Sequence, residues 1–261
     1  EVMINGWISV ARNQGKMAFF DLRDRSGMVQ GVVFGKPEVL EVAKQLSEES
    51  SVAITGVVNP RPEKMVNEKV ENGDIELEIT DIKILNLSEA MPFDKTAELN
   101  IDTLLDYRPL TLRFDRQKAI FNIQSTITRG YGEYLRTEGF TEFQAPKIVG
   151  GDAEGGAEVF KVDYFKDVVA SLATSPQLYK QIMVGAFERV FSFATAFRAE
   201  KSATSRHLSE YTSLDMEMGF ITDHTDIMKV ETGLMKHIAQ RLAELNQADL
   251  DTLGIELPQI P

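Results

Sequence analysis

Residues 190–200, VFSFATAFRAE, and residues 210–220, EYTSLDMEMGF, decide the fold of the C-terminal half of this chain. Both segments alternate apolar residues with small or polar ones, which is the period of a strand with one buried face. The polar stretch between them, KSATSRHLS at 201–209, suits a connecting loop. The pattern therefore predicts a β-hairpin. Its buried face is expected to carry Phe191, Phe193, Phe197, Leu214, Met216, Met218 and Phe220.

The other face of this hairpin is small and charged. It is expected to carry Ser192, Ala194, Ala196, Arg198 and Glu200 from the first segment, and Tyr211, Ser213, Asp215 and Glu217 from the second. Small side chains leave space above the sheet, and acids, an aromatic ring and cations at the rim suit an ATP site without a Walker loop. A structural cross-strand ion pair of Arg198 with Glu200 or Glu217 is the alternative explanation.

Composition sets wider limits. The chain has 261 residues, of which 43% are hydrophobic and 26% charged, as in a soluble globular protein. It has no apolar run of membrane-spanning length, no signal segment and no cysteine, a composition that fits a cytoplasmic protein. A net charge of −12 argues against a general nucleic-acid binder, so any RNA contact needs a local basic patch.

Such a patch is expected near the N-terminus. Between residues 8 and 36, five cations face two acids, which gives a local net charge of +3. The cations are Arg12, Lys16, Arg23, Arg25 and Lys36, and the acids are Asp21 and Asp24. Short strands are predicted at 3–12, 16–25, 28–34, 51–58 and 75–85, with a helical stretch at 37–48. Five strands around one helix predict an OB-fold barrel over residues 1–86, a fold that commonly binds single-stranded nucleic acid.

The rest of the chain predicts a second domain with mixed secondary structure. Residues 87–110 contain Pro92 and Pro109 and little periodicity, as expected of a hinge or linker. Helical spacing follows in two places. The first helix carries Ile120, Ile123, Ile127, Tyr131 and Tyr134, and the second Ile227, Val230, Leu234, Ile238, Leu242 and Leu245. The chain is therefore predicted to be an α+β protein.

Four segments in order resemble one known family. The first motif has an arginine followed two residues on by an acid, then a histidine four residues before an aromatic. It is matched by FRAE at 197–200 and RHLSEYTSLDMEMGF at 206–220. EGFTEFQAPKIV at 138–149 and the glycine-rich GGDAEGGAEVF at 150–160 precede it. SPQLYKQ at 175–181 is the most selective piece. These segments resemble motif 2, motif 1, the mobile loop and the amino-acid pocket of class II aminoacyl-tRNA synthetases of the aspartyl, asparaginyl and lysyl subgroup.

The resemblance implies a fold and an activity. Residues 111–261 are expected to form the N-terminal part of a class II catalytic domain, an antiparallel sheet flanked by helices. SPQLYKQ is typical of aspartyl members, so the implied reaction is ATP-dependent activation of L-aspartate and its transfer to tRNA. The resemblance leaves open whether the asparagine tRNA is charged as well. It also implies a homodimer through the motif 1 region, in which the helix that carries Ile120 to Tyr134 and the strand after it form the interface and Pro146 lies across the symmetry axis. A plain core-packing helix is the alternative.

The resemblance assigns roles to individual residues. Arg198 would bridge the substrate carboxylate and the α-phosphate as the catalytic residue. ATP binding would use Arg198, Glu200, His207 and Tyr211, with Tyr211 stacked under adenine. Aspartate binding would use Glu154, Ser175, Gln177, Lys180, Arg198 and Asp215, with Lys180 on the side-chain carboxylate and Asp215 on the ammonium. No metal ligand is assigned among residues 1–261, because the Mg²⁺ that accompanies ATP is expected to have its ligands beyond Pro261.

In the barrel, the resemblance makes Arg12, Phe19 and Gln30 the readers of the anticodon. Phe19 would stack on a base and Gln30 would hydrogen-bond to a base edge. Because Phe19 and Phe20 are adjacent and point to opposite faces, one of them is core. Gln30 is alternatively an ordinary strand residue, and Lys16 and Arg25 are expected to be solvated.

The chain also departs from the family pattern. Thr174 stands where glutamine is usual, and the stretch 192–196 lacks the usual polar residue and proline. Motif 3 and an initiator methionine are absent, so we expect a piece of a longer enzyme that is inactive by itself. A noncatalytic tRNA-binding paralogue and an asparagine-making enzyme on the same platform are the alternatives from other classes. The first should have lost Lys180, Arg198 and Asp215, and the second lacks the barrel. Asparaginyl-tRNA synthetase is the nearest alternative within the family.

Overall fold

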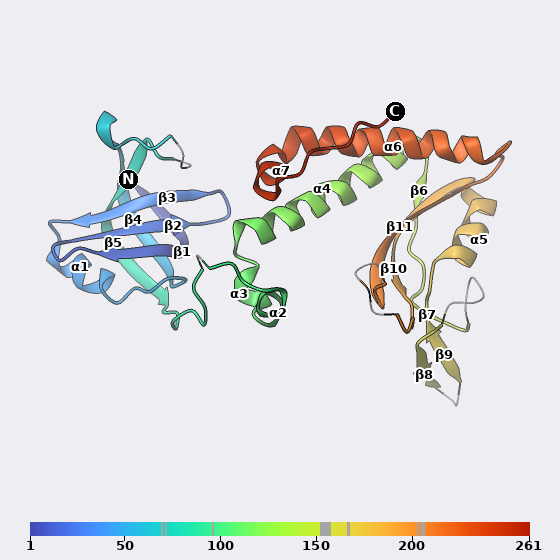
Figure 1. Cartoon of the computed structure of the whole chain (residues 1–261), viewed down its shortest axis with the longest axis horizontal. Helices are drawn as coiled ribbons and strands as arrows, with labels where there is room; N and C mark the ends of the chain where they lie inside the picture. Colours follow the sequence, from blue (N-terminus) through green and yellow to red (C-terminus); the bar gives the residue numbers. More distant parts are fainter. Residues whose placement is uncertain are drawn as a thin grey trace. The chain divides into compact units, whose positions relative to one another are not determined.

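The computed structural model describes residues 1–68, 70, 72–95, 97–151, 158–165, 168–202, 204 and 207–261. The chain divides into two compact units, Glu1–Leu99 and Asn100–Pro261, and Figure 1 shows the elements of each. None of the helices within the described ranges is both long enough and apolar enough to cross a membrane.

The N-terminal unit is a closed barrel in the strand order β1–β2–β3–β5–β4. Its strands are β1 (Val2–Asn13), β2 (Met17–Arg23), β3 (Met28–Phe34), β4 (Ser51–Pro60) and β5 (Ile75–Asn86). Helix α1 (Pro37–Ala43) follows β3, and a short 3₁₀ turn, η1 (Glu63–Met65), lies between β4 and β5. The β3–β5 pair is parallel and the other four pairs are antiparallel. The predicted five-stranded OB-fold barrel is confirmed, with a helix that ends at Ala43 rather than residue 48.

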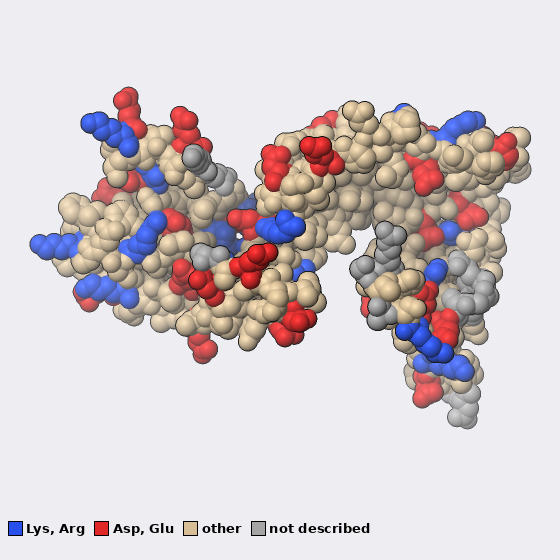
Figure 2. Space-filling view, in the orientation of Figure 1, with Lys and Arg blue, Asp and Glu red and all other residues tan. Residues whose placement is uncertain are grey.

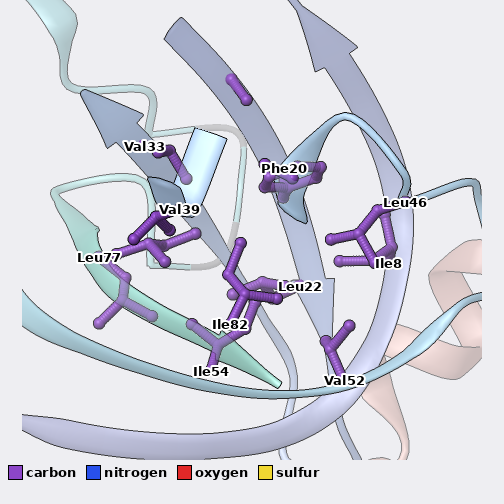
Figure 3. Packing of buried hydrophobic residues seen from close by; sticks show 13 residues of the cluster. Ile8, Phe20, Leu22, Val33, Val39, Leu46, Val52, Ile54, Leu77 and Ile82 are labelled. Carbon is purple, nitrogen blue, oxygen red and sulfur yellow. The ribbon is translucent and has the colours of Figure 1, made fainter. Parts of the chain in front are cut away.

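Alternation along the strands fills the barrel interior. Inward side chains from all five strands and from α1 form one core, seen in Figure 3. Phe20 and Leu77 are fully buried in it. Gly31 lets β3 approach β5, because a Cβ there would lie only 2.8 Å from Cδ1 of Ile79. Phe20 is thus the core member of the Phe19–Phe20 pair, and Phe19 lies on the outer face, half-buried.

The C-terminal unit contains two three-stranded sheets and six helices among its described residues. The first sheet has the order β11–β10–β6 and the second the order β7–β9–β8. The strands are β6 (Thr141–Glu142), β7 (Ile148–Val149), β8 (Lys161–Asp163), β9 (Val169–Leu172), β10 (Arg189–Phe197) and β11 (Glu210–Met218). The helices are α2 (Ile101–Asp106), α3 (Arg108–Thr111), α4 (Asp115–Thr137), α5 (Gln177–Phe187), α6 (His224–Leu245) and α7 (Gln247–Leu253).

Helices α4 and α6 cover the apolar face of β10 and β11. The cluster joins Tyr131 and Leu135 of α4 to Phe191 of β10 and Leu234 of α6. Gly233 lets the two helices approach, since a Cβ there would lie 1.9 Å from the hydroxyl oxygen of Tyr134. The two predicted helices are therefore present and pack on each other as well as on the sheet.

The predicted hairpin is present, and its predicted buried face is wrong at two apolar positions. β10 and β11 pair antiparallel from Arg189↔Met218 to Phe197↔Glu210. Phe220 is 94% exposed, because β11 ends at Met218 and Phe220 adopts a positive φ of 56° that turns it away. Leu214 is 38% exposed, since the helices cover only the other end of the hairpin. The β6–β10 pair is parallel, an exception in an otherwise antiparallel sheet.

Two short helices occupy the end of the segment that sequence predicts to be a hinge. α2 and α3 both belong to the C-terminal unit, which begins at Asn100. Asn100 caps α2, because its side-chain oxygen accepts a hydrogen bond from the Thr103 amide at 2.8 Å. A hinge would therefore lie before Asn100, and its motion stays a prediction.

Candidate active site and nucleic-acid interface

The polar face of the β10–β11 hairpin is assembled by its register. Ser192 lies opposite Asp215, Ala194 opposite Ser213, and Ala196 opposite Tyr211. Residues directly opposite each other in an antiparallel pair share a face, so the predicted platform of small residues beside polar ones is present. The three small residues of β10 are at most 1% exposed.

An ion pair lies at the centre of this face. Nζ of Lys180, on α5, lies 2.8 Å from Oδ1 of Asp215 and 3.4 Å from Oε2 of Glu217. The side chains of Lys180 and Asp215 are only 9% and 16% exposed. Among the described residues, the second oxygen of Asp215 has no hydrogen-bond partner. The site thus holds one ammonium between two carboxylates, and one carboxylate oxygen is left for a further donor.

Glu217 forms an ion pair with Lys180 of helix α5, which is a helix–strand contact and not the cross-strand pair with Arg198 considered from the sequence. The sequence places Glu217 on this face and assigns it no role in substrate binding. The pairing of Glu217 depends on the position of helix α5, and the apolar–polar alternation of a strand carries no information about that position. α5 begins where Ser175 accepts a hydrogen bond from the Gln177 amide, at 3.1 Å. Ser175 and Gln177, which are both predicted to bind aspartate, thus lie at the start of the helix that carries Lys180.

Arg198 and Tyr211 lie together at the loop end of the hairpin. The guanidinium carbon of Arg198 lies 5.8 Å from the ring centre of Tyr211. The Arg198 amide donates to the carbonyl of Ser209 at 3.0 Å and so extends the ladder past the last strand pair. This geometry sets a cation over an aromatic face at the rim of the platform, a contact that the sequence did not predict.

Glu200 and His207 lie close to each other in the connecting loop. Nε2 of His207 is 3.8 Å from Oε2 of Glu200, and Nδ1 of His207 is 2.7 Å from Oγ1 of Thr204. Both side chains are more than a third exposed, so this pair is easily separated by a ligand. Glu154 lies outside the described residues.

Two titratable groups that sequence reasoning did not assign interact with Asp215. Burial lowers the pKa of Lys147, an effect that the charge of Asp215 partly offsets. Burial raises the pKa of Tyr131, and the Asp215 charge raises it further. Lys147 directly precedes β7, and its carbonyl accepts from the Ala173 amide at 2.9 Å. No periodic signal marks Lys147, because its position depends on a strand pair formed with residues that are distant in sequence.

The outer face of the barrel brings the three predicted RNA-contacting residues together. Arg12 lies opposite Phe19 in the β1–β2 ladder. Asp21, two residues after Phe19 on the same face, lies opposite Gln30 in the β2–β3 ladder. Arg12, Asp21 and Gln30 also line one pocket, together with Arg61 directly after β4. Sequence reasoning did not identify Arg61, which follows a Pro-containing strand end and carries no periodic signal.

The predicted basic patch is largely neutralised by partners. Arg12 pairs with Asp21 at 3.0 Å, Arg23 with Glu49 at 3.0 Å, and Lys36 with Glu78 at 3.4 Å. The patch is therefore not a free cationic surface, a correction to the expectation from local charge. On the face seen in Figure 2, acidic and basic side chains lie intermixed. The Arg12–Asp21 pair is half-exposed at Arg12, so it contributes little stability and is easily separated.

The part of the chain that the structure describes contains no group of three or more His, Cys, Asp or Glu side chains able to hold a metal ion. The expectation that Mg²⁺ ligands lie beyond Pro261 stays a prediction. The polar face presents the charged side chains of Lys180, Asp215 and Arg198 beside the Tyr211 ring, an arrangement able to bind a charged ligand that also carries a flat ring.

Comparison with known proteins identifies two families. Residues 100–260 match the tRNA synthetases class II (D, K and N), and residues 2–85 match the OB-fold nucleic acid binding domain. The aspartate–tRNA(Asp/Asn) ligase of Deinococcus radiodurans is 42% identical in sequence to this chain, and the alignment covers all of this chain and 57% of that protein. The asparagine–tRNA ligase of Desulforamulus reducens is 36% identical, and the alignment covers all of this chain and 59% of that protein.

A solved structure gives the same result. Asparaginyl-tRNA synthetase from Pyrococcus horikoshii, complexed with asparaginyl-adenylate, superposes with a TM-score of 0.86 at 35% identity. The match covers 96% of this chain and 57% of that one. The chain thus spans less than two thirds of the length of these relatives.

Proposed function

Because this chain belongs to the class II tRNA synthetases of the aspartate, lysine and asparagine (D, K and N) group, we propose that its protein activates L-aspartate with ATP and transfers it to tRNA. The relatives named aspartate–tRNA ligase support this choice of amino acid. In this proposal the hairpin face binds aspartate and ATP, and the barrel binds the anticodon loop.

The Lys180–Asp215 pair is the observation that carries the proposal. L-Aspartate brings a side-chain carboxylate and an α-ammonium, which are the same two charges in the opposite arrangement. The substrate can therefore exchange partners with the resident pair, its carboxylate meeting Lys180 and its ammonium meeting Asp215. Once Asp215 has turned to the substrate ammonium, the Lys180 ammonium binds a charged carboxylate more strongly than a neutral amide, which favours aspartate over asparagine.

Activation joins the aspartate α-carboxylate to the α-phosphorus of ATP, with loss of pyrophosphate. Two negatively charged groups must meet, so fixed cations lower the barrier. Arg198 is the proposed catalytic residue, since one guanidinium can donate to both groups. Its guanidinium lies over the Tyr211 ring, so an adenine that stacks on that face would take its place and leave Arg198 free to meet the α-phosphate. Glu200 and His207 would separate to meet the adenine amino group and the γ-phosphate.

Other parts of the proposal rest on the resemblance. Glu154 would contact the substrate ammonium, with Ser175 and Gln177. Mg²⁺ would enter with ATP and add positive charge at the phosphates. A homodimer through the motif 1 region and a cytoplasmic location also stay predictions. In support of the dimer, α4 leaves Ile120 and Phe121 more than 40% exposed.

Amino-acid-dependent exchange of pyrophosphate into ATP tests the proposal. The complete protein that carries this chain should support exchange with aspartate at a rate far above the rates with asparagine and lysine. Exchange that is faster with asparagine would favour the alternative enzyme, asparaginyl-tRNA synthetase. Absence of exchange with all three, despite tRNA binding, would favour a noncatalytic paralogue.

A further inference from the structure

Four side chains form a continuous hydrogen-bonded row on the outer face of the barrel. Nη2 of Arg12 lies 3.0 Å from Oδ1 of Asp21. The same oxygen accepts from Nε2 of Gln30 at 3.5 Å, and Oε1 of Gln30 accepts from Nη2 of Arg61 at 3.1 Å. The row crosses β1, β2 and β3 and ends at the residue directly after β4. Gln30 is thus held at both ends of its amide.

The chemistry of the two neighbours fixes which way this amide points. A guanidinium only donates hydrogen bonds, and an ionised carboxylate only accepts them. Oε1 of Gln30 must therefore face Arg61, and Nε2 must face Asp21. The reversed amide would place the NH₂ group against a guanidinium and the carbonyl against a carboxylate, so both contacts would be lost. The orientation follows from the donors and acceptors alone.

The orientation matters because an amide reads a base through one donor and one acceptor. In this row, Nε2 keeps a second hydrogen and Oε1 a second lone pair for a ligand. Uracil presents a carbonyl beside a ring N–H, and cytosine presents an amino group beside a bare ring nitrogen. The two pyrimidines thus offer donor and acceptor in exchanged places. An amide held in one orientation can hydrogen-bond to only one of the two pyrimidines, because the other places donor against donor and acceptor against acceptor. An amide that turns freely can hydrogen-bond to either pyrimidine.

Phe19 supplies the second condition, a fixed position for the base. It lies on the same outer face as Asp21, opposite Arg12. Stacking on Phe19 would fix the plane of the base and bring its edge towards Gln30, which then reads the order of donor and acceptor along that edge.

We propose that Asp21 and Arg61 are positioning residues that hold the Gln30 amide in one orientation and so determine which pyrimidine the barrel selects. This inference rests on the proposed function, in which the outer face of the barrel binds the anticodon loop. Asp21 also pairs with Arg12, so the same carboxylate holds both side chains.

The test is charging of tRNA transcripts in which each anticodon base is exchanged between uracil and cytosine. In the complete protein, we expect the unaltered enzyme to discriminate strongly at one position. Asp21→Asn and Arg61→Gln should each reduce that discrimination by roughly tenfold, within the range expected of one base contact. Aspartate-dependent pyrophosphate exchange should stay within twofold. Glu78→Gln, which removes the Lys36 ion pair elsewhere on the barrel, is the matched control.

A double substitution separates positioning from folding. If Asp21 acts through Gln30, then Asp21→Asn should have no further effect on discrimination in a Gln30→Ala protein. Equal slowing of all transcripts by Asp21→Asn, or unchanged discrimination, would overturn the inference, as would an unaltered enzyme that discriminates at no position. An enzyme that fails to activate aspartate would instead overturn the proposed function, because the exchange assay does not involve the barrel.

Discussion

Nζ of Lys180 and Oδ1 of Asp215 lie 2.8 Å apart in a part of the molecule where both side chains are at least 84% shielded from solvent. The pair joins α5 to the second strand of the hairpin. Removing one member leaves the other charge buried, and in the proposed function it also removes one half of the aspartate pocket.

We therefore expect Lys180→Leu to weaken aspartate recognition by about 3 kcal/mol, since a substrate carboxylate would be left unpaired in the pocket. Pyrophosphate exchange at varied aspartate and varied ATP concentrations measures this, and the KM for ATP should change little. Lys161→Leu, at an exposed position on β8, is the control. A Lys180→Leu enzyme within twofold of the unaltered one would contradict the assignment.

Phe19→Ala should weaken tRNA charging by about 1–3 kcal/mol through loss of one stacked base, with adenylate formation unchanged. Phe20→Ala is the matched comparison, because that side chain is fully buried in the barrel core. Its removal should destabilise the barrel by about 3–5 kcal/mol. Thermal unfolding and charging assays on both proteins separate the two roles. A Phe19→Ala protein that unfolds as readily as Phe20→Ala would show that Phe19 is a core residue.

Tyr131→Phe should make the C-terminal unit more stable at neutral pH, by about 1 kcal/mol. Among the described residues, the buried Tyr131 hydroxyl has no hydrogen-bond partner, so the native state loses solvation there without compensation. Urea unfolding at pH 7 measures the change, and a less stable variant would refute this account.

The same hydroxyl predicts a pH dependence. Burial raises the native pKa of Tyr131 above the unfolded value of about 10. The native state therefore keeps its proton while the unfolded state loses it, and stability falls as pH rises above about 10. Unfolding measured between pH 9 and 11 should show a shallower loss in Tyr131→Phe than in the unaltered protein. Equal slopes would contradict the predicted linkage.

Phe121→Asp should convert the expected homodimer into a monomer, because it places a charge on the exposed apolar side of α4. Light scattering during size-exclusion chromatography of the complete protein gives the mass. Ile101→Asp, at a position 64% exposed on α2, should leave the dimer intact. A dimer that survives Phe121→Asp would place the interface elsewhere.

Much of the fold could be predicted because strand alternation is a local property. The period-two pattern predicted which residues of β10 and β11 share the polar face, and the register confirms it. The same rule failed at Phe220, where the chain leaves the strand and the alternation no longer applies. Partners could not be predicted in the same way. Glu217 pairs with a helix, and Arg61, directly after β4, reaches Gln30 on the non-adjacent strand β3, so both contacts depend on tertiary packing.

The parallel pairing of β3 with β5 has a consequence for synthesis on the ribosome. β5 contacts both β3 and β4, so the barrel stays open until the chain has been made as far as Asn86. Until then one edge of β3 and one edge of β4 have no strand to pair with, and these edges are exposed to wrong pairings. Closure is thus late and non-local, and the nascent chain passes through an interval in which chaperones can bind it.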